Sequence, residues 1–441
     1  TPPINGLERV VHLRGSGCND DVDTDTAQDW RLRWTRIGAS TPCVDQHLSD
    51  LQAMRPIIGP EAGVVDLVQW IDGATTSLQV QVYQITEANM VHALIRAAER
   101  GVEVQVVMDA GDDWWDEAAL RNVDGMAASL SEAGIEVLLH GAEDDDAYAF
   151  MHAKIAVRDH EEVWLGSGNW KPSSAPGPGE DGNRDWSIIV ESEQLVEALD
   201  VLLAMDRDPS SLYVRPAEAT APVGWTLPPT RALSGSVSSP VPGVASRELL
   251  TCPDDCIAGI TGLLDEAEEE ILLSLQYLEL DWTWGWGDTP LLTSIHDAAA
   301  RGVHVRVVLN GAYLDDEVQE VVDLLNEDWN ASEGLDVSAV LMSSGEGVTK
   351  LHNKGAIVDR EHVLISSINW GDSAMLRNRE IGLIVHDVTL ASVFLASWQE
   401  DWDRLDDQTD TDNDGLIDAW EVLHGTDRKS TRLNSSHQII S

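Results

Sequence analysis

The chain has 441 residues, 43% of them hydrophobic, and its 77 acidic and 28 basic residues give a formal net charge of −49. This length predicts two or three globular domains, and no stretch approaches the roughly 18 apolar residues of a membrane-spanning helix. The acidic surface is typical of adaptation to high salt, and it argues against a broad nucleic-acid interface, which normally appears as a basic patch.

Residues 1–50 are expected to form a small β-rich accessory segment. Alternating apolar and polar side chains over 7–13 and 30–34 predict two strands. The ending at 38–42 resembles the close of a lamin-tail-like β-sandwich, a common extracellular accessory domain. An irregular acidic linker is the alternative, because the turn at 19–25 carries four aspartates.

Residues 55–205 alternate between helical and strand patterns. Gly101 stands where the C′ glycine of a helix belongs. The predicted helices are 64–71, 88–100 and 117–133, and the predicted strands are 77–83, 102–108, 135–139, 153–157, 162–165 and 187–190. This alternation predicts an α/β sandwich.

Residues 249–405 repeat the same order. Residues 98–107 match 299–308 in register, and the triplet Asn183-Arg184-Asp185 matches Asn378-Arg379-Glu380. The segment between the two halves, 206–248, is rich in proline and serine and is expected to be a linker with little regular structure. The sequence therefore predicts a duplicated domain.

One extended motif occurs once in each half, His-x-Lys-x4-Asp-x6-[Gly/Ser]-Ser-x-Asn-Trp. The first copy runs from His152 to Trp170 and the second from His352 to Trp370, a constant offset of 200 residues. Both motifs contain a lysine, although the whole chain has only five, at 154, 171, 350, 354 and 429. Two extended copies spaced by a domain's length indicate a shared function.

The residue types of this motif suit the cleavage of a phosphodiester. That reaction needs a nucleophile, a proton donor for the leaving oxygen and positive charge near the phosphoryl oxygens, and two imidazoles can divide the first two roles. A lone strand histidine is usually structural, but two in one context, each beside a scarce lysine, favour catalysis. The candidate catalytic residues are His152, His352, Lys154, Lys354, Asn169 and Asn369, and Ser167 and Ser367 are candidate substrate-binding hydroxyls.

The doubled motif resembles the signature of the phospholipase D superfamily, over roughly residues 55–405. Ser366 stands where that family usually has glycine. The resemblance implies two α/β sandwich halves with pseudo-twofold symmetry around one active site, and catalysis without a cofactor. It also implies a covalent phosphohistidine on His152, with His352 as the acid and base.

The same resemblance assigns the nearby carboxylates. Asp185 and Glu380 are expected to orient the histidines, whereas Asp159 and Asp359 are expected to be structural. The alternative for Asp185 and Glu380 is a salt bridge with the preceding arginine.

A calcium loop is predicted near the C-terminus, within 408–427. Oxygen donors stand at loop positions 1, 3, 5, 9 and 12 with Gly415 at position 6, and the segment resembles a thrombospondin type 3-like repeat. A disordered acidic tail is the alternative. Residues 428–441 resemble a translated sequencing-adapter read-through and are interpreted as non-native. The expected structural Ca²⁺ ligands are Asp410, Asp412, Asp414, Leu416, Asp418 and Glu421.

The chain is therefore expected to be a secreted or cell-surface phosphodiesterase. Its expected substrate is a phospholipid, cleaved or transferred by a monomer in peripheral contact with a membrane and without a stable nucleic-acid complex. The alternatives are an extracellular nuclease of the same superfamily and a non-catalytic, calcium-dependent surface protein. The chain begins at Thr1 and is interpreted as a fragment, so a missing signal peptide carries no weight.

Cysteines and tryptophans provide two further expectations. Cys18 with Cys43 and Cys252 with Cys256 are expected to form local disulfides, with buried thiols as the alternative. The tryptophans in loops after strands are candidates for lipid or base contact, with loop packing as the alternative. These tryptophans are Trp114, Trp115, Trp282, Trp284 and Trp286.

Overall fold

The structure is a computed structural model. It describes residues 10–13, 30–33 and 47–405, apart from 112–115, 142–147, 178, 209–213, 218–219, 234–236, 283–288, 313–315, 343 and 346. The Ca²⁺ loop and the tail at 428–441 therefore lie outside the described residues, as do Cys18, Cys43 and four of the five loop tryptophans (Trp114, Trp115, Trp284 and Trp286).

The first half is built from strands and helices in the predicted order. The α2 helix ends before Gly101, whose φ of 90° is the left-handed conformation expected of a C′ glycine. The elements are β3 (His47–Gly59), α1 (Val64–Asp72), β4 (Ser77–Val82), α2 (Ala88–Glu99), β5 (Glu103–Asp109), α3 (Glu117–Glu132), β6 (Glu136–His140), β7 (Lys154–Arg158), β8 (Glu162–Gly166), η2 (Pro172–Ser174), β9 (Gly182–Glu191), α4 (Glu193–Asp206) and β10 (Val214–Pro216).

The second half repeats this order. Its elements are β11 (Ala245–Cys252), α5 (Cys256–Asp265), β12 (Glu270–Leu275), α6 (Pro290–Arg301), β13 (His304–Asn310), α7 (Asp316–Asp323), η3 (Leu324–Ser332), β14 (Val337–Met342), β15 (Val348–Leu351), β16 (Lys354–Val358), β17 (His362–Ser366), α8 (Asp372–Leu376), β18 (Glu380–His386) and α9 (Val388–Leu405). The expectation of two similar α/β halves is confirmed.

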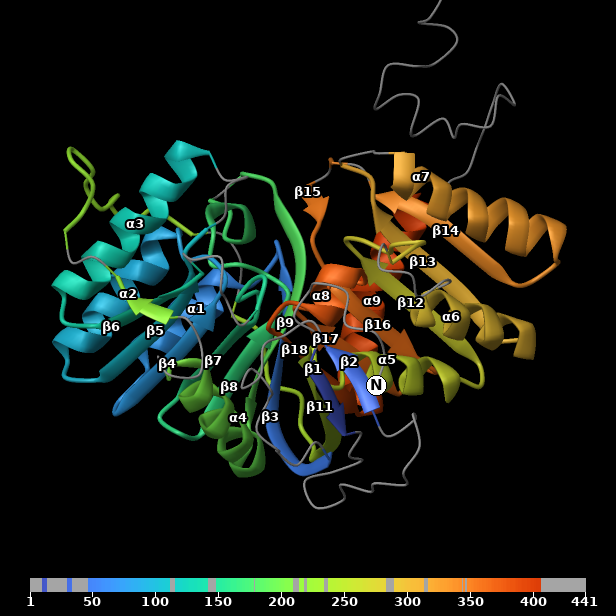
Figure 1. The fold of residues 1–441 in the computed structure, drawn as a ribbon, viewed down its shortest axis with the longest axis horizontal. Helices are drawn as coiled ribbons and strands as arrows, with labels where there is room; N and C mark the ends of the chain where they lie inside the picture. Colours follow the sequence, from blue (N-terminus) through green and yellow to red (C-terminus); the bar gives the residue numbers. More distant parts are fainter. Residues whose placement is uncertain are drawn as a thin grey trace, which may run out of the picture.

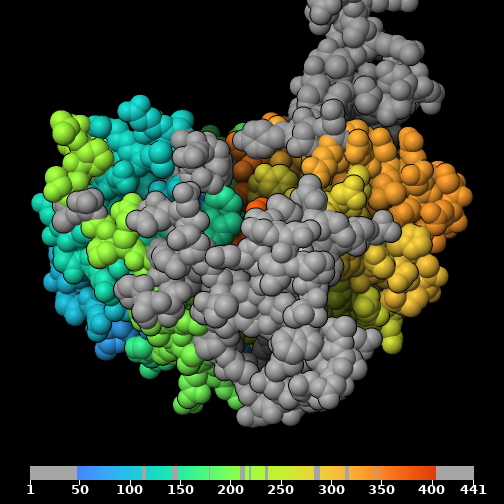
Figure 2. Space-filling view, in the orientation of Figure 1, coloured from blue at the N-terminus to red at the C-terminus, as the bar shows by residue number. Residues whose placement is uncertain are grey.

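A single mixed sheet runs through both halves (Figure 1). Its order is β10-β6-β5-β4-β7-β8-β9-β3-β11-β18-β17-β16-β12-β13-β14, with β15 attached to β9. Read outward from the β3–β11 pair, the two halves have the same strand order, so an approximate twofold axis passes between these two strands. In space-filling view the blue-to-green half and the yellow-to-orange half lie side by side (Figure 2).

The strand β3 joins the halves and was not predicted from the sequence. It pairs with β9 on one side and with β11 on the other. Its register shifts between Gln52 and Arg55, where Ala53 has a positive φ of 48°, and this irregularity breaks the period-two pattern that reveals a strand. The expected boundaries near 50–55 and at 248–249 consequently fall inside β3 and β11.

Three large apolar clusters hold the sheet and helices of the described residues together. One packs α1, α2 and α3 against β4, β5 and β6, and a second packs α5 and α6 against β12, β13 and β14. The third lies at the centre, where Leu199 of α4 and Phe394 of α9 pack with residues of both halves. Because this third cluster is shared, the halves form one body around their junction.

The remaining expectations concern the smaller segments. β1 (Val10–Leu13) and β2 (Trp30–Arg33) pair antiparallel within the predicted ranges. Cys252 and Cys256 form a disulfide. Trp282 is buried in the core of the second half, which agrees with the packing alternative. Within the described part of the chain, no helix is long and apolar enough to cross a membrane.

Candidate active site

Two equivalent strand pairs carry the doubled motif to the junction. Lys154 begins β7 and pairs with Val82 of β4, and Lys354 begins β16 and pairs with Leu275 of β12. Each histidine precedes its strand by two residues. The motif histidines and lysines are therefore held at the ends of central strands.

Each motif histidine is paired with a carboxylate from the opposite half. The Nδ1 of His152 lies 2.7 Å from Oε1 of Glu380, and the Nδ1 of His352 lies 2.8 Å from Oδ1 of Asp185. All four residues are buried or nearly so. The structure thus brings together residues that are separated by 228 and 167 positions in the chain.

The backbone crosses between the halves in the same way. The amide of His152 donates to the carbonyl of Arg379 over 3.0 Å, and the amide of His352 donates to the carbonyl of Arg184 over 3.0 Å. The strand β15 extends the second crossing, because Leu351 pairs with Arg184 in parallel register. Each histidine is therefore positioned by the half that does not contain it.

The two arginines do not pair with the acids that follow them. Arg184 is buried and binds Asp401 of α9 at 2.8 Å, and Arg379 is buried and binds Asp206 of α4 at 2.7 Å. These ion pairs also join opposite halves. The alternative that Asp185 and Glu380 serve as salt-bridge partners of the preceding arginines is therefore wrong.

The charge state of the acids determines the tautomer of the histidines. Burial by itself raises the pKa of Asp185 and of Glu380, but the interaction with the adjacent histidine, the lysine charge and the serine hydroxyl outweigh it, so both pKa values are lowered. An ionised carboxylate only accepts hydrogen bonds. Each imidazole therefore donates its Nδ1–H and turns the lone pair of Nε2 outward.

Burial keeps both imidazoles neutral. It lowers the pKa of His152 to about 4, with Glu380 opposing and Lys154 adding to the effect. It also lowers the pKa of His352 well below its usual value, with Lys354 adding to the effect and Asp185 opposing it. A neutral imidazole with an exposed Nε2 lone pair is a nucleophile for phosphorus.

The motif lysines differ in what holds them. Each lysine donates to the carbonyl of its own motif histidine, but Lys154 lies 5.3 Å from the centre of the Tyr83 ring, whereas Lys354 also donates to Oε1 of Gln276 over 2.6 Å. Burial lowers the pKa of Lys154 to about 7 and that of Lys354 well below its usual value. Tyr83 and Gln276 were missed from the sequence, and their positions directly after β4 and β12 are the signal that marks them.

The two asparagines complete the inward-facing polar groups. The Oδ1 atoms of Asn169 and Asn369 are buried and have no hydrogen-bond partner among the described residues. Buried amides are normally satisfied. An amide oxygen only accepts hydrogen bonds, so a phosphate group would be bound through the Nδ2 donors of these residues instead.

Ser167 and Ser367 have a different role from the one predicted. Ser167 donates to Oδ1 of Asp185 over 2.8 Å, and Ser367 donates to Oε2 of Glu380 over 2.6 Å. Both hydroxyls also accept a backbone amide, and both residues are fully buried. They hold the orienting carboxylates in place, and the prediction that they bind substrate is wrong.

Ser366 stands where a glycine was expected, and a glycine on the neighbouring strand makes room for its side chain. Gly166 pairs with Ser187, whereas Ser366 pairs with Gly382. A Cβ at Gly166 would lie 2.3 Å from the Cβ of Ser187, so this pair has room for one side chain only, and a Cβ at Gly382 would lie 3.1 Å from that of Ser366. The second half places its serine on the opposite strand of the same pair.

Asp159 and Asp359 lie at the far ends of the motif strands, away from the histidines. Asp159 accepts the backbone amides of residues 75–77, and Asp359 accepts those of residues 268–270. These bonds lower the pKa of both acids despite the opposing effect of burial. Their contacts are those of loop anchors.

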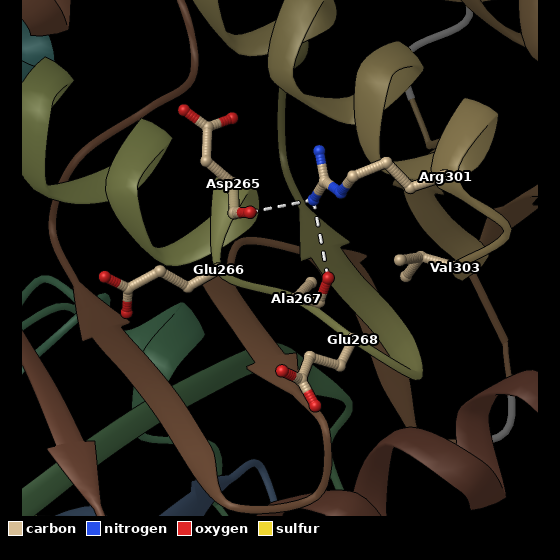
Figure 3. Close-up of a pocket in the computed structure, with 6 residues that line it drawn as sticks. All are labelled: Asp265, Glu266, Ala267, Glu268, Arg301 and Val303. Atoms are coloured by element: carbon tan, nitrogen blue, oxygen red, sulfur yellow. Dashed lines mark hydrogen bonds between the residues drawn. The ribbon is translucent and has the colours of Figure 1, made fainter.

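An open hollow of about 690 Å³ lies at this same far edge of the second half (Figure 3). The guanidinium of Arg301 crosses it to donate to the carbonyls of Asp265 and Ala267, at the end of α5. The hollow adjoins the amino ends of β12 and β13, whereas the motif residues lie at the carboxyl end of β12. It is therefore separate from the candidate active site.

Over the residues that the structure describes, no group of three or more histidine, cysteine, aspartate or glutamate side chains is placed to hold a metal ion. The predicted Ca²⁺ ligands at 410–421 are not among those residues.

Comparison with known proteins identifies both halves. The sequence model of the family described as "Cardiolipin synthase, PLD-like domain" matches residues 67–206 and 260–402. The chain is 30% identical over 148 residues to a phospholipase D of Rickettsia conorii, a match that covers 34% of this chain and 64% of that protein. It is 22% identical over 308 residues to cardiolipin synthase B of Salmonella typhi, covering 67% of this chain and 66% of that protein.

The fold also resembles a solved structure over nearly its whole length. The phosphatidylserine synthase of Haemophilus influenzae Rd KW20 superposes with a TM-score of 0.61 at 13% identity, covering 89% of this chain and 96% of that one. At this identity the likeness concerns the fold. The match to the Rickettsia protein spans slightly less than two thirds of that relative's length.

Proposed function

The chain belongs to the family of cardiolipin synthase, phospholipase D-like domains, and from this premise we propose that it is a phosphodiesterase acting on phospholipids. The observation that supports this most directly is the crossed pairing of His152 with Glu380 and of His352 with Asp185. It provides two oriented imidazoles at one junction, with two motif lysines beside them.

The proposed reaction has two steps. The Nε2 of His152 attacks phosphorus, a P–N bond forms, and the bond to the leaving alcohol breaks as His352 gives that oxygen a proton. His352 then removes a proton from water or from an acceptor alcohol, whose oxygen attacks phosphorus and releases His152. Water yields hydrolysis, and an alcohol yields headgroup transfer.

Protonation of His352 must accompany substrate binding, because burial and the neighbouring ammonium groups keep the free imidazole neutral. A bound phosphodiester carries a negative charge, which raises the pKa of a nearby imidazole. Lys154, Lys354, Asn169 and Asn369 then stabilise the charge on the phosphoryl oxygens. The choice of His152 as nucleophile rests on the family resemblance, in which the N-terminal motif attacks.

A phospholipid substrate is supported by the relatives and by the charge of the chain. The similar proteins of Rickettsia and Salmonella are a phospholipase D and a cardiolipin synthase. A net charge of −49 disfavours a long nucleic acid, whose phosphates a protein normally neutralises with a basic surface. The calcium-loop pattern at 410–421 supports a secreted or cell-surface location, with Ca²⁺ in a structural role.

The test is an activity screen of the purified protein, with and without EDTA. We expect cleavage of bis(p-nitrophenyl) phosphate and of a phospholipid, with EDTA leaving the rates within about twofold because the proposed steps use side chains alone. Cleavage of single-stranded DNA without any phospholipid activity would favour the nuclease. Loss of all activity in EDTA, with the fold intact, would contradict the metal-free mechanism.

A further inference from the structure

The lysines in the described part of the chain gather at the active site. Four of the five lysines, Lys154, Lys171, Lys350 and Lys354, belong to the described residues, and each acts electrostatically on at least one of the others. Elsewhere the chain is strongly acidic, with 77 acidic against 28 basic residues. Lys171 and Lys350 lie outside the repeated motif, so the duplication does not explain them.

Both extra lysines are placed by the elements around Asp185. Lys350 lies on β15 in register with Asn183 of β9, and it stands two residues before His352, on the same face of the chain. Lys171 leads into η2, whose Ser174 donates to Oδ2 of Asp185 over 2.9 Å. Asn183 in turn donates to Ser173 and Ser174 of η2, so the backbone positions of both lysines lie beside Asp185.

These lysines break the symmetry of the two halves. At the offset of 200 residues, the counterpart of Lys350 is Phe150 and the counterpart of Lys171 is Gly371. A Cβ at Gly371 would lie 2.3 Å from a carboxyl oxygen of Glu279, so an acid fills the place that the side chain would take. Phe150 contacts Tyr83, which in turn lies 4.8 Å from the ring of His152. The His152 end is aromatic, and the His352 end is basic.

The extra lysines are not needed to satisfy Asp185. Its two oxygens already accept hydrogen bonds from Ser167, Ser174 and His352. Burial lowers the pKa of both Lys171 and Lys350, and Lys171 lowers that of Lys350 further. Asp185 acts in the opposite sense and raises the pKa of Lys350, and a further anion bound between the two ammonium groups would stabilise both charges.

We propose that Lys171 and Lys350 form a second anion-binding subsite, which receives a phosphate group carried by the leaving or attacking alcohol of a phospholipid. The inference rests on the proposed function, in which His352 exchanges a proton with that alcohol. A dianionic phosphate matches two adjacent ammonium groups better than a neutral or cationic headgroup does. The lipid part of the substrate then lies toward the aromatic end, beside Tyr83 and Phe150.

The test compares two lipids that differ by one phosphate, phosphatidylglycerol and phosphatidylglycerol phosphate, in micelles of an uncharged detergent. We expect the wild type to prefer the second, and the double variant Lys171→Gln/Lys350→Gln to lower the ratio of the two kcat/KM values roughly tenfold or more. The variant Lys350→Arg should retain most of the preference because it keeps the charge. Arg360→Gln, which removes a positive charge from an exposed turn, is the matched control and should leave the ratio unchanged.

An inhibition measurement with soluble compounds tests the subsite without lipid micelles. Glycerol 3-phosphate should inhibit hydrolysis of bis(p-nitrophenyl) phosphate by the wild type more strongly than glycerol does, and the double variant should lose this difference. An equal fall on both lipids, or unchanged inhibition by glycerol 3-phosphate, would overturn the subsite. A loss confined to oligonucleotide cleavage would assign the lysines to a nucleic-acid strand instead. If the wild type hydrolyses bis(p-nitrophenyl) phosphate but does not prefer phosphatidylglycerol phosphate, the subsite alone is refuted. If it cleaves no phosphodiester, the proposed function is refuted as well.

Discussion

His152 and Glu380 lie in different halves of the chain and are joined by a hydrogen bond of 2.7 Å between Nδ1 and Oε1. The equivalent bond from His352 to Asp185 runs in the opposite direction between the halves. Neither half therefore contains a complete histidine–carboxylate pair. The catalytic unit exists only when the two halves are packed together, and the buried Arg184–Asp401 and Arg379–Asp206 pairs hold them in that arrangement.

Removing the charge of Glu380 should slow the reaction without unfolding the protein. In Glu380→Gln the amide cannot hold the Nδ1–H of His152 as a carboxylate does, and we expect kcat to fall roughly 10- to 100-fold. The measurement is steady-state kinetics on bis(p-nitrophenyl) phosphate. Asp159→Asn is the control: it should lower the free energy of unfolding by about 1 kcal/mol and leave kcat unchanged. Equal kinetic losses in both variants would remove the distinction between orienting and structural acids.

Trapping the covalent intermediate should show which histidine is the nucleophile. In His352→Ala, a substrate with a very good leaving group should still phosphorylate His152, because the leaving oxygen needs no proton. Breakdown of the intermediate should be slow, since water lacks its base. Mass spectrometry should place the phosphate on His152, with a burst of one equivalent of nitrophenol. A label on His352 in His152→Ala would reverse the two roles.

The pH dependence of kcat/KM should follow the displaced pKa values of His152 and Lys154. On bis(p-nitrophenyl) phosphate, kcat/KM should rise as pH increases through about 4, because His152 must be neutral to attack. It should fall as pH increases through about 7, because Lys154 loses the charge that stabilises the phosphoryl oxygens. In Lys154→Gln the alkaline limb near 7 should disappear, because the variant lacks the group that titrates there. An alkaline limb that stays near 7 in this variant would assign it to another group.

The pairing of Gly166 with Ser187 can be tested by a double exchange. Gly166→Ser alone places its Cβ against that of Ser187 and should lower the free energy of unfolding by roughly 1–3 kcal/mol. The double variant Gly166→Ser/Ser187→Gly reproduces the Ser366–Gly382 pair and should recover most of that loss. Chemical denaturation of the wild type, both single variants and the double variant measures the coupling. Additive effects would show that the two positions do not share one space.

The sequence by itself determined the duplication, the order of most helices and strands, and the residues of the doubled motif. These features are local: apolar periodicity specifies each element, and repetition at a constant offset marks the motif however the chain folds. The position of Gly101 after α2 is of the same kind, because a helix end depends on the residues next to it.

The tertiary structure decided which residues of the candidate active site pair with one another. Whether Asp185 meets Arg184 or a histidine 167 residues away depends on how β15 and β9 align, which no local pattern encodes. The same holds for Ser167 and Ser367, whose hydroxyls turn toward the buried carboxylates, and for β3, whose bulge hides it from a period-two search. Lys171 and Lys350 also come together only when the two halves pack against each other. The sequence of a short segment shows which side chains are present, but not which distant charges will lie near them.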